Sequence, residues 1–97
     1  MRKVTDKDIE ELYRAILSLK DLREAKPFFR DLLTKVEIDE FAERWKVARM
    51  LASGVPYTKI IEATGLSSTT VARVARWVKK GMGGYRLVLQ RKGMMSQ

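Results

Sequence analysis

The sequence contains no cysteine and no histidine among its 97 residues. The absence of cysteine excludes disulfides, thiolate metal sites and cysteine nucleophiles. The absence of histidine removes the commonest general base and the commonest metal ligand. A Gly-rich phosphate loop, a metal-ligand spacing and a nucleophile elbow are missing as well. The sequence therefore predicts a protein that is not an enzyme and that binds no metal.

Long apolar runs are also missing. None approaches the roughly 20 residues of a membrane span, and no signal-peptide pattern opens the chain. Apolar residues make up 45% and charged residues 33%, as in a folded domain. We therefore expect a single cytoplasmic domain over residues 1–97, with no membrane partner. A chain this short buries only about two-thirds of its unfolded surface, so its core is thin and dimerisation would thicken it.

Acidic residues are scarce in the second half of the chain. Residues 1–53 hold 12 Lys/Arg and 11 Asp/Glu, whereas residues 54–97 hold eight Lys/Arg and a single acid, Glu62. Nearly all of the net charge of +8 therefore lies in the second half. A concentrated positive field is typical of a protein with a polyanionic partner, although a basic face kept for solubility has the same charge. The pattern favours nucleic acid over a membrane surface, because no segment pairs a basic face with a strongly apolar one.

Every organised segment has a helical period, and none alternates apolar and polar residues as a strand does. The sequence predicts six helices, near residues 6–20, 24–34, 36–52, 57–63, 68–80 and 85–92. The first three lie in the charge-balanced half and carry most of the aromatic residues, which we interpret as core or dimer interface.

Local signals indicate where these helices begin. Thr5 and Asp8 have the spacing of a capping box, and Thr34 and Glu37 have the same spacing before the third helix. Pro27 is expected in the first turn of the second helix, where its missing N–H costs little.

Residues 57–80 have the organisation of a helix-turn-helix unit: a short helix, a tight turn and a second helix. Gly65 stands where the chain turns sharply and permits a positive φ there. The second helix carries an apolar stripe that can pack against the first, formed by Val71, Val74, Ala75 and Val78. In DNA-binding proteins the second helix of such a unit enters the major groove.

Polar residues suited to DNA follow the turn. Hydroxyl residues open the second helix, and basic residues then recur every three positions; together they are Ser67, Ser68, Thr69, Thr70, Arg73, Arg76 and Lys79. Hydroxyls and helix N-termini bind phosphate, and Arg or Lys reaches phosphates or guanine edges. Taken singly, the hydroxyls are also ordinary caps, with Ser67 as N-cap, and the basic residues also complement the helix dipole. Their order within one unit predicts binding to double-stranded DNA.

A second interpretation is a module that binds RNA or another protein and uses the helix-turn-helix as a scaffold. Single-stranded nucleic acid is usually bound on aromatic stacking platforms. The basic half offers only Tyr57, Trp77 and Tyr85 for that purpose. DNA therefore remains the favoured partner.

Four strings of the sequence resemble the TrpR-like YerC/YecD family, a branch of the Trp repressor superfamily. They are residues 17–22 (LSLKDL), 28–32 (FFRDL), 47–51 (VARML) and 64–71 (TGLSSTTV). The resemblance implies an all-α, six-helix Trp-repressor-like fold that forms an intertwined homodimer. In that arrangement residues 6–52 form the dimerisation region, residues 57–80 the helix-turn-helix, and residues 85–92 a short C-terminal helix. It also implies a bacterial, repressor-like transcriptional regulator that binds specific DNA sequences.

The resemblance also bears on a ligand. In the Trp repressor two arginines sandwich the indole of a tryptophan corepressor, and those positions match Arg44 and Arg73 here. Arg44 is equally able to pair with Glu40 or Glu43 at the dimer surface, and Arg73 is equally able to contact phosphate. The repressor has glycine and serine where this chain has Val74 and Trp77. These two side chains either fill the ligand slot together, or Val74 points into the helix-turn-helix core and Trp77 covers the last helix. We therefore expect no cofactor and DNA binding that does not require tryptophan.

Overall fold

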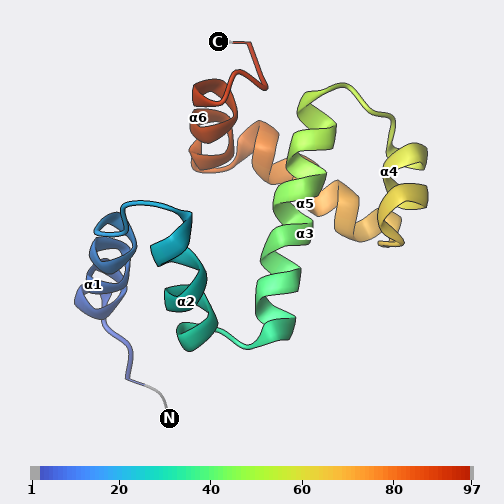
Figure 1. Ribbon diagram of the computed structural model, residues 1–97. Helices are drawn as coiled ribbons and strands as arrows, with labels where there is room; N and C mark the ends of the chain where they lie inside the picture. The colour runs from blue at the N-terminus through green and yellow to red at the C-terminus, as the bar shows by residue number, and fades with distance from the viewer. Residues whose placement is uncertain (1–2, 97) are drawn as a thin grey trace. The chain divides into compact units, whose positions relative to one another are not determined.

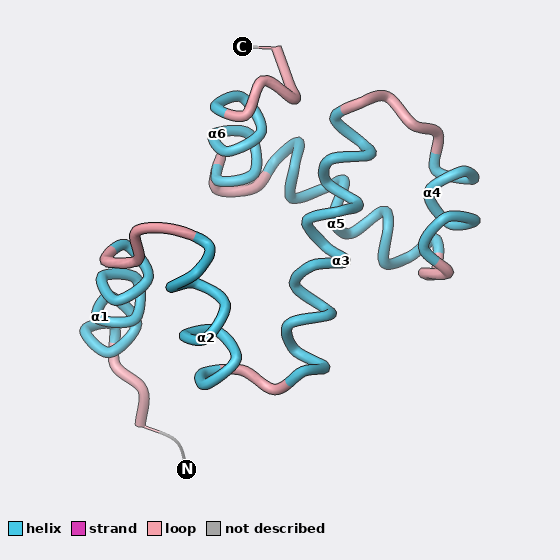
Figure 2. The backbone as a smooth tube through the Cα atoms, in the orientation of Figure 1, coloured by secondary structure: helices cyan, strands magenta, loops and turns pink. Residues whose placement is uncertain are grey.

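The computed structural model describes residues 3–96, which contain six α-helices and no strand (Figures 1 and 2). The helices are α1 (Asp6–Leu17), α2 (Leu22–Leu32), α3 (Lys35–Ala52), α4 (Tyr57–Thr64), α5 (Ser68–Lys80) and α6 (Gly84–Arg91). The predicted all-α, six-helix fold is confirmed. The chain divides into two compact units, one up to Ile38 and one from Asp39 onward. Each unit is described by itself below.

Capping boxes begin α1 and α3, as their sequence spacing predicts. The backbone N–H of Asp8 donates to the Thr5 hydroxyl at 3.1 Å, and the Thr5 N–H donates to the Asp8 carboxylate at 3.0 Å. Thr34 and Glu37 make the same pair of bonds at 3.1 and 2.9 Å. The hydrogen bond from the Thr5 backbone, and secondarily its hydroxyl, lowers the pKa of the Asp8 carboxyl. Thr34 lowers the pKa of Glu37 in the same way.

The first helix is shorter than predicted, because it ends at Leu17 and not near residue 20. Ser18 is its C-cap, and both its hydroxyl and its backbone N–H donate to the Ala15 carbonyl, at 2.6 and 3.1 Å. These bonds satisfy one of the carbonyls left open at the helix end, which accounts for the early stop.

The second helix begins at Leu22, two residues earlier than predicted. The Asp21 carboxylate accepts a hydrogen bond from the Glu24 backbone N–H at 3.1 Å and so acts as N-cap. Pro27 is therefore the sixth residue of α2 and does not lie in its first turn, so that prediction is wrong. The helix tolerates it because the carbonyl left without an N–H partner, that of Arg23, belongs to the exposed first turn.

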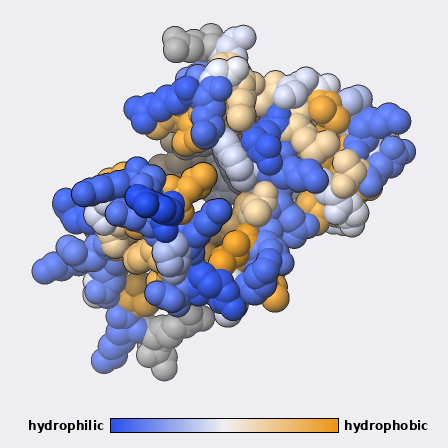
Figure 3. Space-filling model, in the orientation of Figure 1, coloured by the Kyte–Doolittle hydropathy of each residue, from blue (hydrophilic) through white to orange (hydrophobic). Residues whose placement is uncertain are grey.

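The N-terminal unit contains no fully buried residue between positions 3 and 38. Phe28 and Phe29 are half-buried and meet edge to face, with ring centroids 5.6 Å apart and planes at 82°. Many of its large apolar side chains reach the surface: Val4, Ile9, Leu12, Tyr13, Leu17, Leu22, Leu32 and Val36, with Leu17 83% exposed. Figure 3 shows apolar residues at the surface among hydrophilic ones. This unit therefore has amphipathic helices without a core of their own.

The C-terminal unit contains the buried core. Its buried residues come from four helices and are Val47, Ala48, Ile60, Val71, Val74, Ala75, Val78 and Leu89. The predicted apolar stripe of α5 is confirmed, because all four of its residues are in this set. Trp45 of α3 and Tyr85 of α6 stack at the edge of the core, with ring centroids 6.4 Å apart and planes at 6°.

The turn between α4 and α5 is built as the sequence predicts. Gly65 has φ +72°, and its N–H donates to the Ile61 carbonyl at 2.8 Å. Two boundaries differ slightly from prediction: α4 extends to Thr64, and α6 begins at Gly84 after Gly83, which has φ +87°. The left-handed conformation of Gly83 is what allows α6 to begin at that point.

Candidate functional site

The N-terminal turn of α5 is held by its own hydroxyl groups. The Ser67 hydroxyl accepts a hydrogen bond from the Thr70 backbone N–H at 3.2 Å and lies 3.0 Å from the Thr70 hydroxyl. Ser67 is therefore the N-cap, as predicted. Ser68 and Thr69 are exposed beside it. These two residues are the better placed of the four hydroxyl residues to reach an external phosphate.

The outer face of α5, opposite its buried stripe, carries the positive charge. With 100° of rotation per residue, the residues furthest from the buried stripe are Thr69, Arg73, Arg76 and Lys80, and all four are exposed. Lys79 is exposed too but lies on the flank of the helix, lining a mostly apolar groove with Arg86. The three-residue spacing singles out Lys79 and misses Lys80. The seven-residue step from Arg73, two helical turns, is the signal that finds Lys80.

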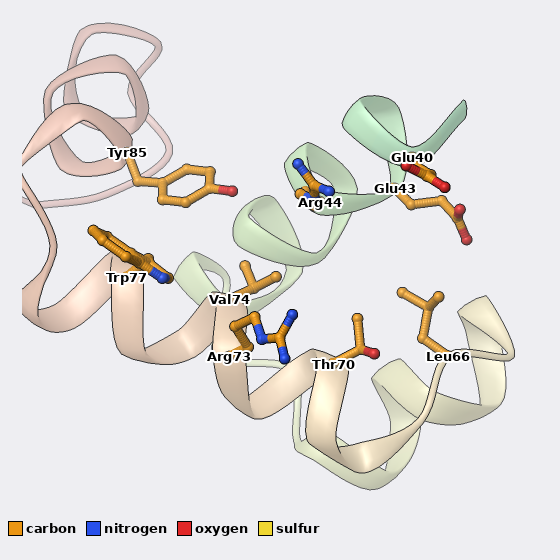
Figure 4. A pocket seen from close by; sticks show the side chains of 9 residues that line it. All are labelled: Glu40, Glu43, Arg44, Leu66, Thr70, Arg73, Val74, Trp77 and Tyr85. Carbon is orange, nitrogen blue, oxygen red and sulfur yellow. The ribbon is translucent and has the colours of Figure 1, made fainter. Parts of the chain in front are cut away.

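An open pocket of about 550 Å³ lies against the other flank of α5. Its lining comes from α3, α5, α6 and the turn, and consists of Glu40, Glu43, Arg44, Leu66, Thr70, Arg73, Val74, Trp77 and Tyr85. Figure 4 shows Arg44 and Arg73 approaching this space from α3 and α5. The structure thus brings together the two arginines that the family resemblance paired. Arg76 and Lys79 do not line this pocket.

Val74 and Trp77 do not fill the pocket. Val74 is 5% exposed and belongs to the core, while Trp77 is 54% exposed and forms a wall. The indole lies close over Gly81: a Cβ added there would lie 2.7 Å from Trp77 Cε3 and 2.4 Å from the Trp77 carbonyl oxygen. In the single chain these side chains line the pocket and leave it open. Glycine at position 81 leaves room for the indole.

The charges around the pocket are mixed. Arg44 and Arg73 share its lining with Glu40 and Glu43. The Arg44 guanidinium carbon lies 5.5 Å from the centroid of the half-exposed Phe41 ring, within range of a cation–π interaction. Across residues 3–96 no ion pair joins Arg44 to Glu40 or Glu43 within the chain.

The described residues offer neither a membrane span nor a metal site. Among the described helices, none is both long enough and apolar enough to span a bilayer. Over the same residues, no three acidic side chains come together in a way that would hold a metal ion.

The sequence of this chain matches the profile of a known protein family. The profile described as Trp repressor protein matches residues 7–93. The chain belongs to the Trp repressor family. It is also 45% identical over 89 residues to YerC, an uncharacterized protein of Bacillus subtilis, covering 92% of this chain and 86% of YerC.

Solved structures agree with this relationship. A TrpR-like protein from Eubacterium eligens superimposes with a TM-score of 0.87 at 43% identity, covering 96% of both chains. A candidate Trp repressor from Staphylococcus aureus superimposes with a TM-score of 0.86 at 33% identity, covering 96% of this chain and 93% of that one. The expected Trp-repressor-like fold is therefore confirmed.

Proposed function

We propose that this member of the Trp repressor family is a sequence-specific DNA-binding regulator that acts as a homodimer. The helix-turn-helix of residues 57–80 presents α5 to the major groove. The observation that carries the proposal is the outer face of α5, where Thr69, Arg73, Arg76 and Lys80 stand opposite a buried apolar stripe. A helix held by one face in this way can offer the other to DNA without unfolding.

The mechanism is noncovalent. Lysine and arginine contacts to phosphates release counterions, which supplies much of the affinity and makes it salt-dependent. Contacts from α5 to base edges supply sequence preference, and the hydroxyls of Ser68 and Thr69 at the start of the helix help to set its register on the backbone.

Dimerisation is part of the proposal. Residues 6–52 would form the interface, because the N-terminal unit has exposed apolar helices and no buried residue between positions 3 and 38. A second copy of the chain would supply the missing apolar partner surface. Two copies of α5 would then read two half-sites, so the operator should be palindromic.

The proposal includes no requirement for tryptophan. Glu40 and Glu43 line the pocket beside Arg44 and Arg73, so the carboxylate of a bound amino acid would meet like charge as well as opposite charge. Calorimetric titration with L-tryptophan should show no saturable binding below about a millimolar, a weak-binding threshold. A tenfold tightening of the DNA complex by tryptophan, about 1.4 kcal/mol of coupling, would contradict this part.

The decisive experiment is a selection of binding sites from random duplex DNA by the purified full-length protein. We expect an enriched palindromic site. On that site Arg76→Ala should weaken binding by roughly 1–3 kcal/mol and relax preference at one position. Lys92→Ala, beyond the end of α6, is the matched control and should leave site preference unchanged. Recovery of sequences with no shared site, bound equally well by both variants, would refute the proposal.

A further inference from the structure

Arg86 makes a hydrogen bond that its charge alone does not suggest. It is the third residue of α6, and its Nε–H donates to the backbone carbonyl of Val78 in α5 at 3.1 Å. The bond spans eight residues of sequence and joins α6 to the last turn of α5.

The Val78 carbonyl lies where a helix needs outside donors. The last four carbonyls of a helix have no partner within it, and α5 ends at Lys80. The Gly81 N–H donates to the Trp77 carbonyl at 3.0 Å, so the carbonyl just before that of Val78 already has a partner. The Arg86 guanidinium donates to the next carbonyl, that of Val78. It also places a positive charge at the negative end of the helix dipole.

The helix that carries Arg86 is itself well anchored. Its neighbour Tyr85 stacks on Trp45 of α3, and Leu89, one turn further along, is fully buried in the core. Arg86 is therefore held at a fixed position relative to α3 and connects that position to the end of α5. The last turn of α5 carries Lys80, part of the outer face described above.

We propose that Arg86 is a positioning residue for DNA recognition, which rests on the function proposed above. Its Nε–H holds the C-terminal turn of α5 against α6, and it acts on DNA through the placement of α5. Although Arg86 belongs to the positive half of the chain, this role does not depend on a phosphate contact. The proposed role rests on the Nε–H donor at the end of α5 and not on contact between the charge and a phosphate.

A matched pair of substitutions separates donor from charge. Glutamine carries its Nε2–H donor the same number of bonds from Cα as arginine carries Nε–H, but has no charge. Methionine has a chain of similar length with neither donor nor charge. Arg86→Gln and Arg86→Met therefore lose the same charge, and of the two only glutamine keeps an N–H donor at the position of Arg86 Nε.

The experiment measures the affinity of full-length variants for the selected site and for unrelated duplex DNA, far below their melting temperatures. Because a single hydrogen bond is at stake, we expect Arg86→Met to discriminate between the two DNAs roughly three- to tenfold less well than Arg86→Gln. The two should share one salt slope. Arg91→Met and Arg91→Gln, an exposed arginine of the same helix, are the control and should not differ.

Other results would overturn the role. If Arg86 contacts phosphate, both variants should weaken binding equally to every DNA and lower the salt slope by about one. A purely structural role would lower the melting temperature of Arg86→Met and leave discrimination intact. Amide hydrogen exchange gives a readout without DNA: residues 79–82 should exchange faster in Arg86→Met than in Arg86→Gln. Equal exchange would refute the hydrogen bond, whereas a wild-type protein without site preference would refute the proposed function.

Discussion

Gly65 shows how one residue determines the turn of the DNA-binding unit. Its φ of +72° lies in the left-handed region, and an added Cβ would meet nothing within 4 Å. Any cost of a side chain there is therefore backbone strain and not a clash. We expect Gly65→Ala to lower the free energy of unfolding by about 1–2 kcal/mol, measured by denaturant titration.

Gly84 is the matched control for that substitution. It also has open space around an added Cβ, but it lies in α6 without a positive φ. Gly84→Ala should leave stability unchanged or slightly raised, because alanine is the better helix former. Equal losses at both positions would show that strain at Gly65 is not the cause.

The two capping boxes predict a dependence of stability on acid. Hydrogen bonds from Thr5 and Thr34 lower the pKa of Asp8 and of Glu37 in the folded chain. A carboxyl with a lowered folded pKa contributes its stability fully above its unfolded pKa and loses it as the pH falls through the folded value. The melting temperature should therefore fall on acidification below about pH 4.5.

The double variant Asp8→Asn, Glu37→Gln tests that cause. Its side chains keep the shape of the caps and cannot titrate. The difference in melting temperature between wild type and variant should shrink as the pH falls toward about 3. A constant difference across that range would show that these two carboxyls do not contribute.

Local contacts between residues three or four positions apart could be predicted from the sequence. The place of a residue in a helix could not be predicted where two local preferences disagree. The pairs Thr5–Asp8 and Thr34–Glu37 satisfy local donors, so their spacing alone indicates the bonds they form. The prediction misplaced Pro27 because proline favours a first turn, whereas Asp21 caps a helix that begins at Leu22, five residues before the proline. Two local preferences competed, and the sequence does not rank them.

At the level of elements, α5 was the most predictable helix. Its four apolar residues recur with the period of one helical face and are all buried in the structure. The pocket beside it was not predictable, because the position of Trp77 depends on Gly81 and on α6, which returns beside the helix. A helical period reports which face is buried but not which neighbouring helix covers each end.

The orientation of α5 predicts unequal roles for its two terminal lysines. Lys80 lies on the outer face with Arg73 and Arg76, whereas Lys79 lines the flanking groove. Lys80→Ala should therefore weaken binding to all DNA sequences and lower the salt slope by about one. Lys79→Ala should have the smaller effect in the same titrations. The reverse order would mean that α5 meets DNA with a different face.

At the level of the whole molecule, the exposed apolar side chains of the N-terminal unit predict self-association. Equilibrium sedimentation at low micromolar concentration should give about twice the chain mass of 11.2 kDa. Leu17 is 83% exposed in the single chain, so Leu17→Glu would be harmless to a monomer. In a dimer it would bury a charge, and we expect it to dissociate the protein.

Lys7→Met serves as the control for Leu17→Glu, since it shifts the net charge by the same amount at a position occupied by a polar residue. This variant should remain dimeric. A wild-type protein that sediments as one folded chain would contradict the dimer, as would Leu17→Glu sedimenting like the wild type.

The uneven distribution of buried residues also sets the order of events in refolding. Every buried residue of the described chain lies beyond Ile38, in the consecutive helices of one compact unit. That part should therefore form rapidly and at a rate independent of protein concentration. Both tryptophans belong to it, and their fluorescence should follow this first-order phase. In the proposed dimer the helices before it gain their apolar partner from a second copy of the chain, so their ordering should be second-order. Dilution would then delay the appearance of helical signal while leaving the tryptophan signal unchanged.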